Sequence, residues 1–292
     1  MKFLVVLWLV FLVLVSGASA QGRDAWAAPW DAYFLPLGTA PMAGSCGLDA
    51  SFRIANYLSY NEGAWGNINT DLEVWTVRFG VRFSSLIGEF SASVPLHLAW
   101  GGILDPALNT LHRWLNVGVS PEPPLSEIRY SLATGESRVV RGTRFGIGDA
   151  LFSWAYRLEP IWLRLSLGIP TGDAAQFFGS GGWRVQFGAG LERKLYGVRI
   201  GVLVPLGQQS AIEVFKPQVS MQLKLWWQLP FVPVLLELHA STSPVQIGGQ
   251  FAATVIALRF VWQTGIGQLA FVEDISPTLP DVVLAWDGQF AC

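Results

Sequence analysis

Residues 145–194, FGIGDALFSWAYRLEPIWLRLSLGIPTGDAAQFFGSGGWRVQFGAGLERK, decide the fold. Two runs in this stretch, Ile161–Ile169 and Trp183–Leu191, alternate apolar and polar residues. In the first run the odd-numbered residues are Ile or Leu, whereas the even-numbered ones are Trp, Arg, Ser and Gly. A period of two is the signature of a β-strand with one apolar and one polar face. The apolar face must therefore meet either a protein core or lipid.

The composition favours lipid. The chain is 51% hydrophobic and only 14% charged, against roughly 25% charged residues in ordinary soluble domains. Beyond residue 20, no run reaches the roughly eighteen apolar residues of a membrane-spanning helix. Apolar residues spread over alternating strands are typical of an outer-membrane β-barrel. The net charge of −2 gives no support for nucleic-acid binding, which requires a basic patch.

The first twenty residues, MKFLVVLWLVFLVLVSGASA, have the pattern of a secretory signal peptide. A lysine precedes an apolar run, and small residues ending at Ala20 form a cleavage site. We expect export, cleavage near Ala20 and a location in the bacterial outer membrane, with an uncleaved anchor as the alternative. Residues 21–45 lack periodicity and are predicted to form an irregular extension, followed by a barrel domain over residues 46–292.

Twelve strand-like runs follow the extension. They cover residues 47–59, 71–84, 87–98, 146–158, 161–171, 182–194, 196–206, 213–228, 232–243, 251–264, 267–274 and 281–291. Connections after the even-numbered runs are short, and those after the odd-numbered runs are longer. This rule is typical of an all-β fold, a transmembrane up-and-down antiparallel β-barrel with periplasmic turns and extracellular loops. A soluble sandwich has Greek-key connections and no reason to follow it.

Large aromatic residues collect near the predicted strand ends. Trp and Tyr gather at membrane interfaces because the ring is apolar while its N–H or O–H seeks water. Packing in a protein core is the alternative. The set near the short turns is Trp154, Tyr156, Trp162, Tyr196, Trp226, Trp227, Phe231 and Trp262, and the set near the opposite rim is Trp75, Trp100 and Trp183.

Charged residues on the polar strand faces are predicted to line the lumen, because a charge in lipid costs several kcal/mol. The candidates are Arg53, Arg78, Arg82, Glu89, Asp149, Arg157, Arg164, Arg184, Glu192, Arg199, Lys224, Glu237, His239 and Arg259. Without the histidine, nine of these are basic and four are acidic. Two alternatives stay open: an electropositive lumen that favours anions, and a network of Arg–carboxylate pairs that fills a narrow barrel.

The long third loop carries a helical signal. Asp105 and Pro106 suit an N-cap and the first helical position, and Gly118 suits the helix end. Leucines at helical spacing and Trp114 form one apolar stripe between them. We predict a short amphipathic helix in this extracellular loop, which either gates the mouth, lies on the membrane or packs on its own hairpin. Glu127–Arg141 is predicted to form a further hairpin.

The two cysteines, Cys46 and Cys292, lie just outside the first and last predicted strands. These two strands are neighbours in a closed barrel of twelve. We therefore predict that the two thiols meet across the closing seam within disulfide reach. An exported protein permits such a bond.

The sequence offers little catalytic chemistry. Its three histidines are His97, His112 and His239, and only His239 lies near a serine, Ser241, on a polar face. No third group or nucleophile motif accompanies this pair. The chain has no Gly-x-Ser-x-Gly elbow, phosphate loop, Cys-x-x-Cys or histidine cluster. We predict no enzyme, no cofactor and no metal.

Two motifs carry a family resemblance. FGIGDALFSWAYRL (145–158) and GIPTGDAAQFFGSGGW (168–183) resemble a bacterial outer-membrane β-barrel family, domain of unknown function 3187, and more distantly the barrels of a meta-pathway of phenol degradation. Residues 90–118 and 271–284 resemble the same family, so the likeness covers most of residues 34–291. Barrels of this sort commonly end in an aromatic residue, whereas here Ala291 and Cys292 follow Phe290. The resemblance implies an outer-membrane barrel without an established activity, and the distant relatives imply uptake of small hydrophobic or aromatic compounds.

Together these features predict a monomeric barrel that acts as a narrow, passive channel for small solutes, hydrophobic or aromatic ones included. The alternative is a non-conducting barrel that anchors envelope components, and an outer-membrane lipid-modifying enzyme ranks third. Expected partners are outer-membrane lipid, the solutes, the barrel-insertion machinery and envelope components, and not nucleic acid.

Overall fold

The structure is a computed structural model. It describes residues 37, 46–64, 66–104, 106, 110, 113–114, 126–207, 215–243, 245–247, 250–251, 255–264, 267–274 and 282–291. The predicted signal peptide, the N-terminal extension apart from Leu37, His112 and Cys292 lie outside these residues.

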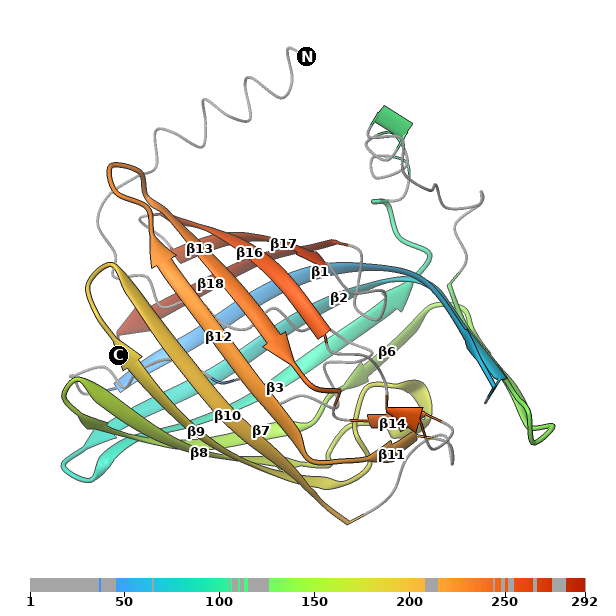
Figure 1. The fold of residues 1–292 in the computed structure, drawn as a ribbon, viewed down its shortest axis with the longest axis horizontal. Helices are drawn as coiled ribbons and strands as arrows, with labels where there is room; N and C mark the ends of the chain where they lie inside the picture. Colours follow the sequence, from blue (N-terminus) through green and yellow to red (C-terminus); the bar gives the residue numbers. More distant parts are fainter. Residues whose placement is uncertain are drawn as a thin grey trace.

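Twelve long antiparallel strands form a closed barrel (Figure 1). They are β1 (Cys46–Gly63), β2 (Gly66–Ser85), β3 (Gly88–Trp100), β7 (Ala150–Leu158), β8 (Ile161–Ile169), β9 (Trp183–Glu192), β10 (Tyr196–Leu206), β12 (Ser220–Gln228), β13 (Val234–Ser241), β16 (Val255–Thr264), β17 (Gly267–Asp274) and β18 (Val282–Ala291). Each pairs with the next barrel strand along the chain, and β1 pairs with β18 to close the ring. The predicted up-and-down barrel is therefore confirmed.

Shorter elements lie at the end of the barrel that carries the longer connections. They are β4 (Glu127–Leu132), β5 (Ser137–Arg141), β6 (Arg144–Ile147), β11 (Phe215–Pro217), β14 (Val245–Ile247), β15 (Gln250–Phe251) and the 3-10 turn η2 (Ala174–Gln176). The β4–β5 pair confirms the hairpin predicted over Glu127–Arg141.

The helix predicted over Asp105–Gly118 is not seen as an element, since only Pro106, Thr110, Arg113 and Trp114 of that stretch are described. In the described part of the chain, no helix has the length and hydropathy needed to cross a membrane.

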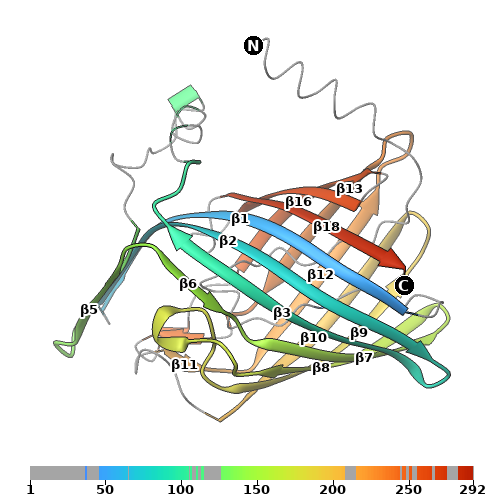
Figure 2. The ribbon, with the colours of Figure 1, turned by 180° about the vertical axis from the view of Figure 1, so that it is seen from behind.

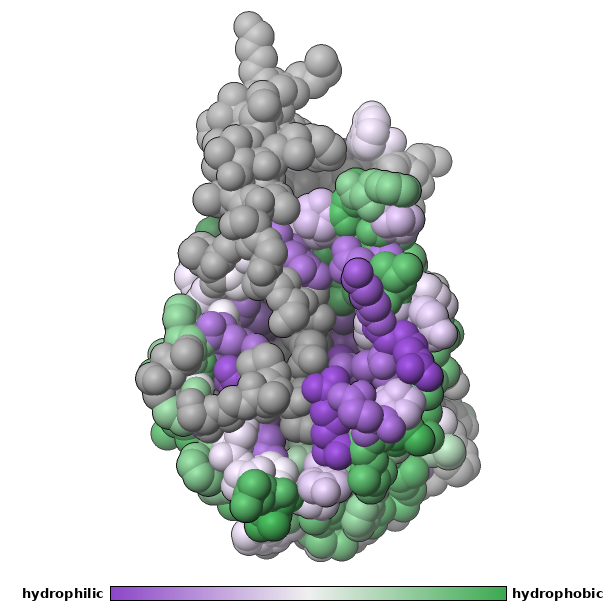
Figure 3. Space-filling model, turned by 90° about the vertical axis from the view of Figure 1, so that its left-hand side faces the viewer, coloured by the Kyte–Doolittle hydropathy of each residue, from purple (hydrophilic) through white to green (hydrophobic). Residues whose placement is uncertain are grey.

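The strands separate two environments. On β9, Trp183 and Phe187 are 45% and 58% exposed, whereas Arg184 and Gln186 are buried at 5% and 1%. The apolar residues point outward and the polar ones into the barrel, which is the arrangement of a transmembrane barrel. Viewed from the end with the short turns, hydrophilic residues gather toward the centre and hydrophobic ones toward the rim (Figure 3).

The sequence predicted a loop over residues 60–70, between the first two strands, and this prediction is wrong. β1 and β2 instead continue as one ladder up to the pair Gly63 and Gly66. Beyond the end of β3, β4 takes its place beside β2 and pairs with Gly66–Asp71. This second partner keeps the Asn- and Gly-rich segment extended, although its composition is typical of a turn. The resulting hairpin projects beyond the barrel (Figure 2).

The fourth predicted strand, 146–158, is interrupted at Gly148 and Asp149 and becomes β6 and β7. The neighbouring strand β3 carries Pro95 at this level, and proline has no N–H to donate. Regular β3–β7 pairing ends at Ser93, and the amide of Gly148 donates to the carbonyl of Pro95 across 2.8 Å. The strand predicted over 213–228 is likewise split, into β11 and β12.

Most of the predicted girdle residues that the structure describes lie on the outer face. Trp154 donates its indole N–H to the carbonyl of Ile87 at 2.8 Å and stacks on Tyr156. Two assignments are wrong, because Trp162 and Trp226 point into the barrel. In both cases the residue paired across the ladder is a glycine, which leaves the room that the indole ring fills.

We predict that Phe187→Arg destabilises the folded barrel in lipid vesicles by about 2–4 kcal/mol, because it places a charge in the membrane. The free energy of unfolding is measured by urea titration with tryptophan fluorescence. Phe187→Leu is the control, with an expected loss below about 1.5 kcal/mol. An Arg variant as stable as the wild type would show that this face does not contact lipid.

The closing seam yields a second prediction. Gly47 pairs with Ala291, and Cys46, next to this pair, is disulfide-bonded. The predicted partner, Cys292, is the only other cysteine in the sequence. Alkylation of unreduced, urea-unfolded protein should leave both thiols unlabelled, and reduction should release both. Labelling without reductant would refute the Cys46–Cys292 bond.

Candidate functional site

The structure places the predicted lumen residues on the inner strand faces, except for Asp149, which lies at the interruption between β6 and β7. The buried ones are Arg53, Glu89, Asp149, Arg184, Arg199, Lys224, Glu237, His239 and Arg259. Arg78, Arg82, Arg164 and Glu192 are half-buried, and Arg157 is exposed at the short-turn rim beside Glu159. The lumen is therefore polar over much of its wall.

Glu237 is the centre of a buried charge network. Its carboxylate lies 3.0 Å from Lys224 Nζ, 3.0 Å from Arg259 Nη1 and 3.1 Å from His239 Nε2. Arg259 reaches on to Asp287 at 2.9 Å. Lys224, Glu237 and Arg259 are each at most 1% exposed, so these charges neutralise one another away from water.

Further ion pairs line other sectors of the wall. Asp49 lies 3.2 Å from Arg82, and Glu192 lies 2.7 Å from Arg199. The guanidinium of Arg199 also lies over the ring of Trp162, 5.8 Å from its centroid, at a distance that allows cation–π attraction. The lumen thus matches the paired alternative of the sequence analysis more closely than an open electropositive pore.

Two buried apolar clusters flank the charge network. The first, the mouth cluster, lies toward the loop end and contains Ala55, Tyr57, Ile68, Leu72, Val74, Ala99, Ile128, Tyr130, Leu132, Phe177, Phe178, Val255, Ala257, Val272 and Val283. The second lies toward the short turns and contains Trp226, Leu235, Val261, Ala270 and Ala285. The inward residues of β16 follow this order along the strand: Ala257 belongs to the mouth cluster, Arg259 to the charge network and Val261 to the second cluster.

The β8–β9 loop, residues 170–182, brings two phenylalanines into the mouth cluster. Phe177 and Phe178 are each 2% exposed. The ring of Phe178 stacks on His97 with centroids 5.5 Å apart, and the guanidinium of Arg144 lies 6.0 Å from its centroid. His97 is itself fixed by a 2.9 Å hydrogen bond with the Thr76 hydroxyl.

One carboxylate anchors both legs of this loop. Asp149 accepts hydrogen bonds from Gly172 N at 3.0 Å, from Ser180 N at 2.9 Å and from the Ser180 hydroxyl at 2.7 Å. Arg184 adds a charged contact at 2.8 Å. Thr171 completes the anchor, since its hydroxyl donates to Gly148 O and accepts from Ala150 N, both at 2.9 Å. The Gly-Asp and Thr-Gly-Asp motifs of the sequence thus meet at the strand interruption.

The β4–β5 hairpin contributes Ile128, Tyr130 and Leu132 to the mouth cluster. Arg138 donates to Ala175 O at 3.3 Å and Arg144, on β6, donates to Gln176 O at 3.2 Å, which ties this region to the β8–β9 loop. Within the hairpin, burial and a 2.8 Å hydrogen bond to Glu136 raise the pKa of Tyr130 to about 12. The phenol therefore stays protonated at neutral pH.

Burial raises the pKa of Glu127, on β4, but contacts with Arg141 and Arg129 outweigh it. The net shift is downward, and the carboxylate stays charged.

Phe177, Phe178 and Glu73 were not among the site residues predicted from the sequence. The signal for the first two is the pair of adjacent aromatic residues inside a glycine-rich polar loop, which indicates that the loop inserts into the barrel mouth. Glu73 is fully buried on β2, where it accepts from Trp75 Nε1 at 2.5 Å and from Ile103 N and Leu104 N at 3.1 and 2.9 Å. It fixes the start of the long third loop.

The histidine and serine singled out in the sequence, His239 and Ser241, both lie on the inner face of β13. His239 lies on the inner face against Glu237, and the Ser241 hydroxyl donates to the carbonyl of Thr242 at 2.7 Å. A lipid-modifying dyad on the membrane face is therefore not supported by this pair. Within the described residues, no three Asp, Glu, His or Cys side chains are grouped to hold a metal ion.

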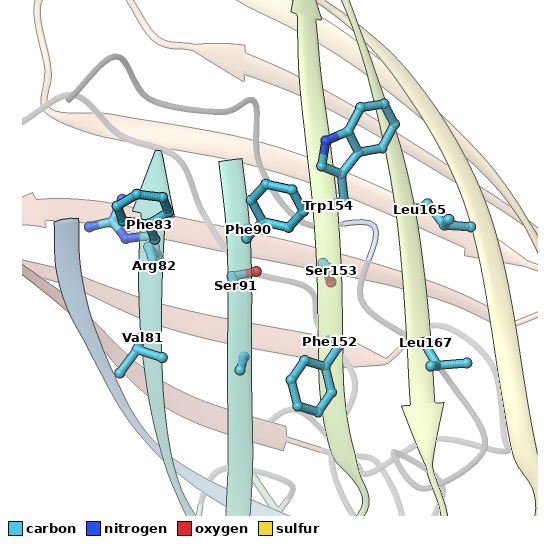
Figure 4. A pocket seen from close by; sticks show the side chains of 11 residues that line it. Val81, Arg82, Phe83, Phe90, Ser91, Phe152, Ser153, Trp154, Leu165 and Leu167 are labelled. Carbon is cyan, nitrogen blue, oxygen red and sulfur yellow. The ribbon is translucent and has the colours of Figure 1, made fainter. Parts of the chain in front are cut away.

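The outer wall carries open apolar grooves. One, of about 380 Å³, runs between β2, β3, β7 and β8 and is lined by Phe83, Phe90, Phe152 and Trp154 (Figure 4). A second, of about 620 Å³, lies around Phe187 and Met221. Both belong to the lipid-facing surface.

The sequence matches no protein-family model, and no curated protein matches it. Solved barrels are similar in fold. An outer-membrane channel from Pseudomonas putida F1 is 13% identical with a TM-score of 0.49, covering 86% of this chain and 97% of that one. The toluene transporter TodX of P. putida is 10% identical with a TM-score of 0.42, covering 85% and 89%. The toluene transporter TbuX of Ralstonia pickettii is 8% identical with a TM-score of 0.43, covering 86% and 90%. At these identities the likeness says nothing about the lumen side chains.

We predict that Glu237→Gln lowers the stability of the barrel by about 3–5 kcal/mol, because it removes the carboxylate that pairs with both Lys224 and Arg259 in the buried network. Heating in detergent should convert the folded band to the unfolded band on a gel at a lower temperature. Glu159→Gln is the control, since that carboxylate is 72% exposed in its pair with Arg157, and such pairs contribute about 1 kcal/mol or less. Equal conversion temperatures for the two variants would contradict a stabilising network.

Proposed function

We propose that this outer-membrane barrel is a narrow passive channel for small solutes, and that it favours hydrophobic and aromatic ones. The observation that carries the proposal is the mouth cluster, an apolar zone on the inner face where an ordinary aqueous pore would be polar. The charge network around Glu237 lies deeper. A solute from outside meets the apolar zone first.

The free energy with which such an apolar zone binds a solute is suited to transport. Burying one CH₂ group contributes about 0.8 kcal/mol, so a small aromatic compound gains on the order of 4 kcal/mol. That corresponds to a dissociation constant near 1 mM. Conduction needs binding that is favourable enough to enter and weak enough to leave.

The paired charges below the mouth affect ions more than neutral solutes. Lys224, Arg259 and His239 surround Glu237, and Arg259 also reaches Asp287, so fixed cations and anions alternate at close range. A neutral solute has no large electrostatic barrier to cross there, whereas a bare ion loses hydration without finding an unmatched counter-charge. The wall therefore favours uncharged cargo.

A non-conducting structural barrel is the second candidate. The observation that favours it is the full burial of Lys224, Glu237 and Arg259 within one ion-paired network. Such a network fills space and rigidifies the wall. Solute flux separates the two candidates, because only a channel accelerates it.

We predict that host cells carrying the protein in their outer membrane take up a radiolabelled small aromatic compound several-fold faster than cells without it. Val272 and Val283 face each other across β17 and β18 in the mouth cluster. Changing both to threonine keeps their shape but adds hydroxyls, and should reduce the acceleration at least threefold. Val202→Thr on the lipid-facing side of β10 is the matched control. Uptake equal to that of cells without the protein would favour the structural barrel.

A further inference from the structure

The two ends of the β8–β9 loop, its legs, pack against each other, and we call this closed loop the clip. Its two legs touch through glycines: a Cβ on Gly172 would lie 2.5 Å from the carbonyl oxygen of Phe178, and one on Gly179 would lie 2.6 Å from the carbonyl carbon of Gly172. No larger residue fits at either position. The Asp149 carboxylate then holds both legs at once through Gly172 and Ser180.

The tip of the clip is strained. Asp173 caps the turn η2 by accepting from the amides of Ala175 and Gln176 at 2.9 and 3.3 Å. Phe177 follows with φ at 64°, in the left-handed region that β-carbon contacts disfavour. A non-glycine residue keeps this conformation only where its surroundings impose it, and such residues concentrate at clamps and switches. Here the amide of Phe177 donates to Ala174 O at 3.1 Å and that of Phe178 to Asp173 O at 2.9 Å, while both rings pack in the mouth cluster.

Phe178 occupies a place that is shaped for a flat ring. It lies parallel to His97, with an interplanar angle of 14°, and under the guanidinium of Arg144. Gly146 on β6 leaves the space, since a Cβ there would come within 2.4 Å of the Phe178 ring. An aromatic solute offers the same flat apolar surface as the phenylalanine ring and makes equivalent contacts once that ring moves aside.

We propose that Phe177 and Phe178 are the gate of the channel, and that Asp149 is the positioning residue that holds them in the mouth. This inference rests on the proposed channel function. With the rings in place, ions and water meet an apolar constriction, and such constrictions close by dewetting. An aromatic solute displaces Phe178 from its contacts with His97 and Arg144. The gate therefore selects the class of solute that can replace its own side chains.

Conductance of single barrels in a planar bilayer with potassium chloride tests the gate. Wild-type protein should conduct little, and the double variant Phe177→Ala/Phe178→Ala should conduct at least tenfold more. Phe187→Ala, which removes a lipid-facing ring from β9, should conduct like the wild type. Heat-dependent gel migration establishes that each variant is folded.

A thiol reporter separates positioning from stability. Ala257→Cys places a cysteine in the mouth cluster, where Ala257 is 0% exposed. A positively charged methanethiosulfonate reagent should label it at least tenfold faster in folded protein that also carries Asp149→Asn. Glu192→Gln, which breaks a lumen ion pair away from the loop, should leave the rate unchanged. Where Asp149→Asn does not fold, Ser180→Ala removes the hydroxyl that donates to Asp149 and should raise the labelling rate by a smaller factor.

Two results overturn the gate. If the phenylalanine double variant conducts like the wild type while wild-type cells still take up the aromatic compound, the gate is wrong and the channel stands. If neither conductance nor uptake exceeds its background, both proposals fail. Labelling of the Ala257→Cys thiol that rises equally with Glu192→Gln would reduce Asp149 to a structural role.

Discussion

A bilayer core offers no hydrogen-bond partners, so every backbone amide that enters it must be satisfied by the protein itself. The ladder between β1 and β18 meets this requirement for the last open edges and turns a sheet into a barrel. Closure then divides each strand into a face for lipid and a face for the lumen. The charge network, both apolar clusters and the loop anchor all lie on the side that closure creates, which is why they depend on it.

The lumen combines charge and apolar surface in layers. On β16, three successive inward residues, Ala257, Arg259 and Val261, belong to the mouth cluster, the charge network and the second cluster. Apolar neighbours lower the local dielectric, which strengthens pairing between Glu237 and its cations and raises the cost of losing either partner. The same layering places the larger of the two apolar clusters at the loop end of the barrel.

The sequence predicted the barrel, its strand number and the inward side of its charges, because alternation is a local property of each strand. It placed Trp162 and Trp226 in the outer girdle, whereas both point into the barrel. An indole in the girdle and an indole that packs inward over a glycine differ only in the residue paired across the ladder, and the pattern of a single strand does not show that residue. The loop at 60–70 was wrong because pairing with β4, which is more than fifty residues distant, overrides local turn composition. The Asp149 contacts join residues 23 to 35 positions apart, and no spacing rule anticipates them.

The interruption between β6 and β7 also constrains the order of events during assembly. Gly148 and Asp149 are completed by Thr171, Gly172, Ser180 and Arg184, which come later in the chain. Until β8 and the start of β9 exist, that part of the wall has an unsatisfied carboxylate and an unsupported backbone. The fourth barrel strand therefore reaches its native contacts only together with the fifth and the start of the sixth.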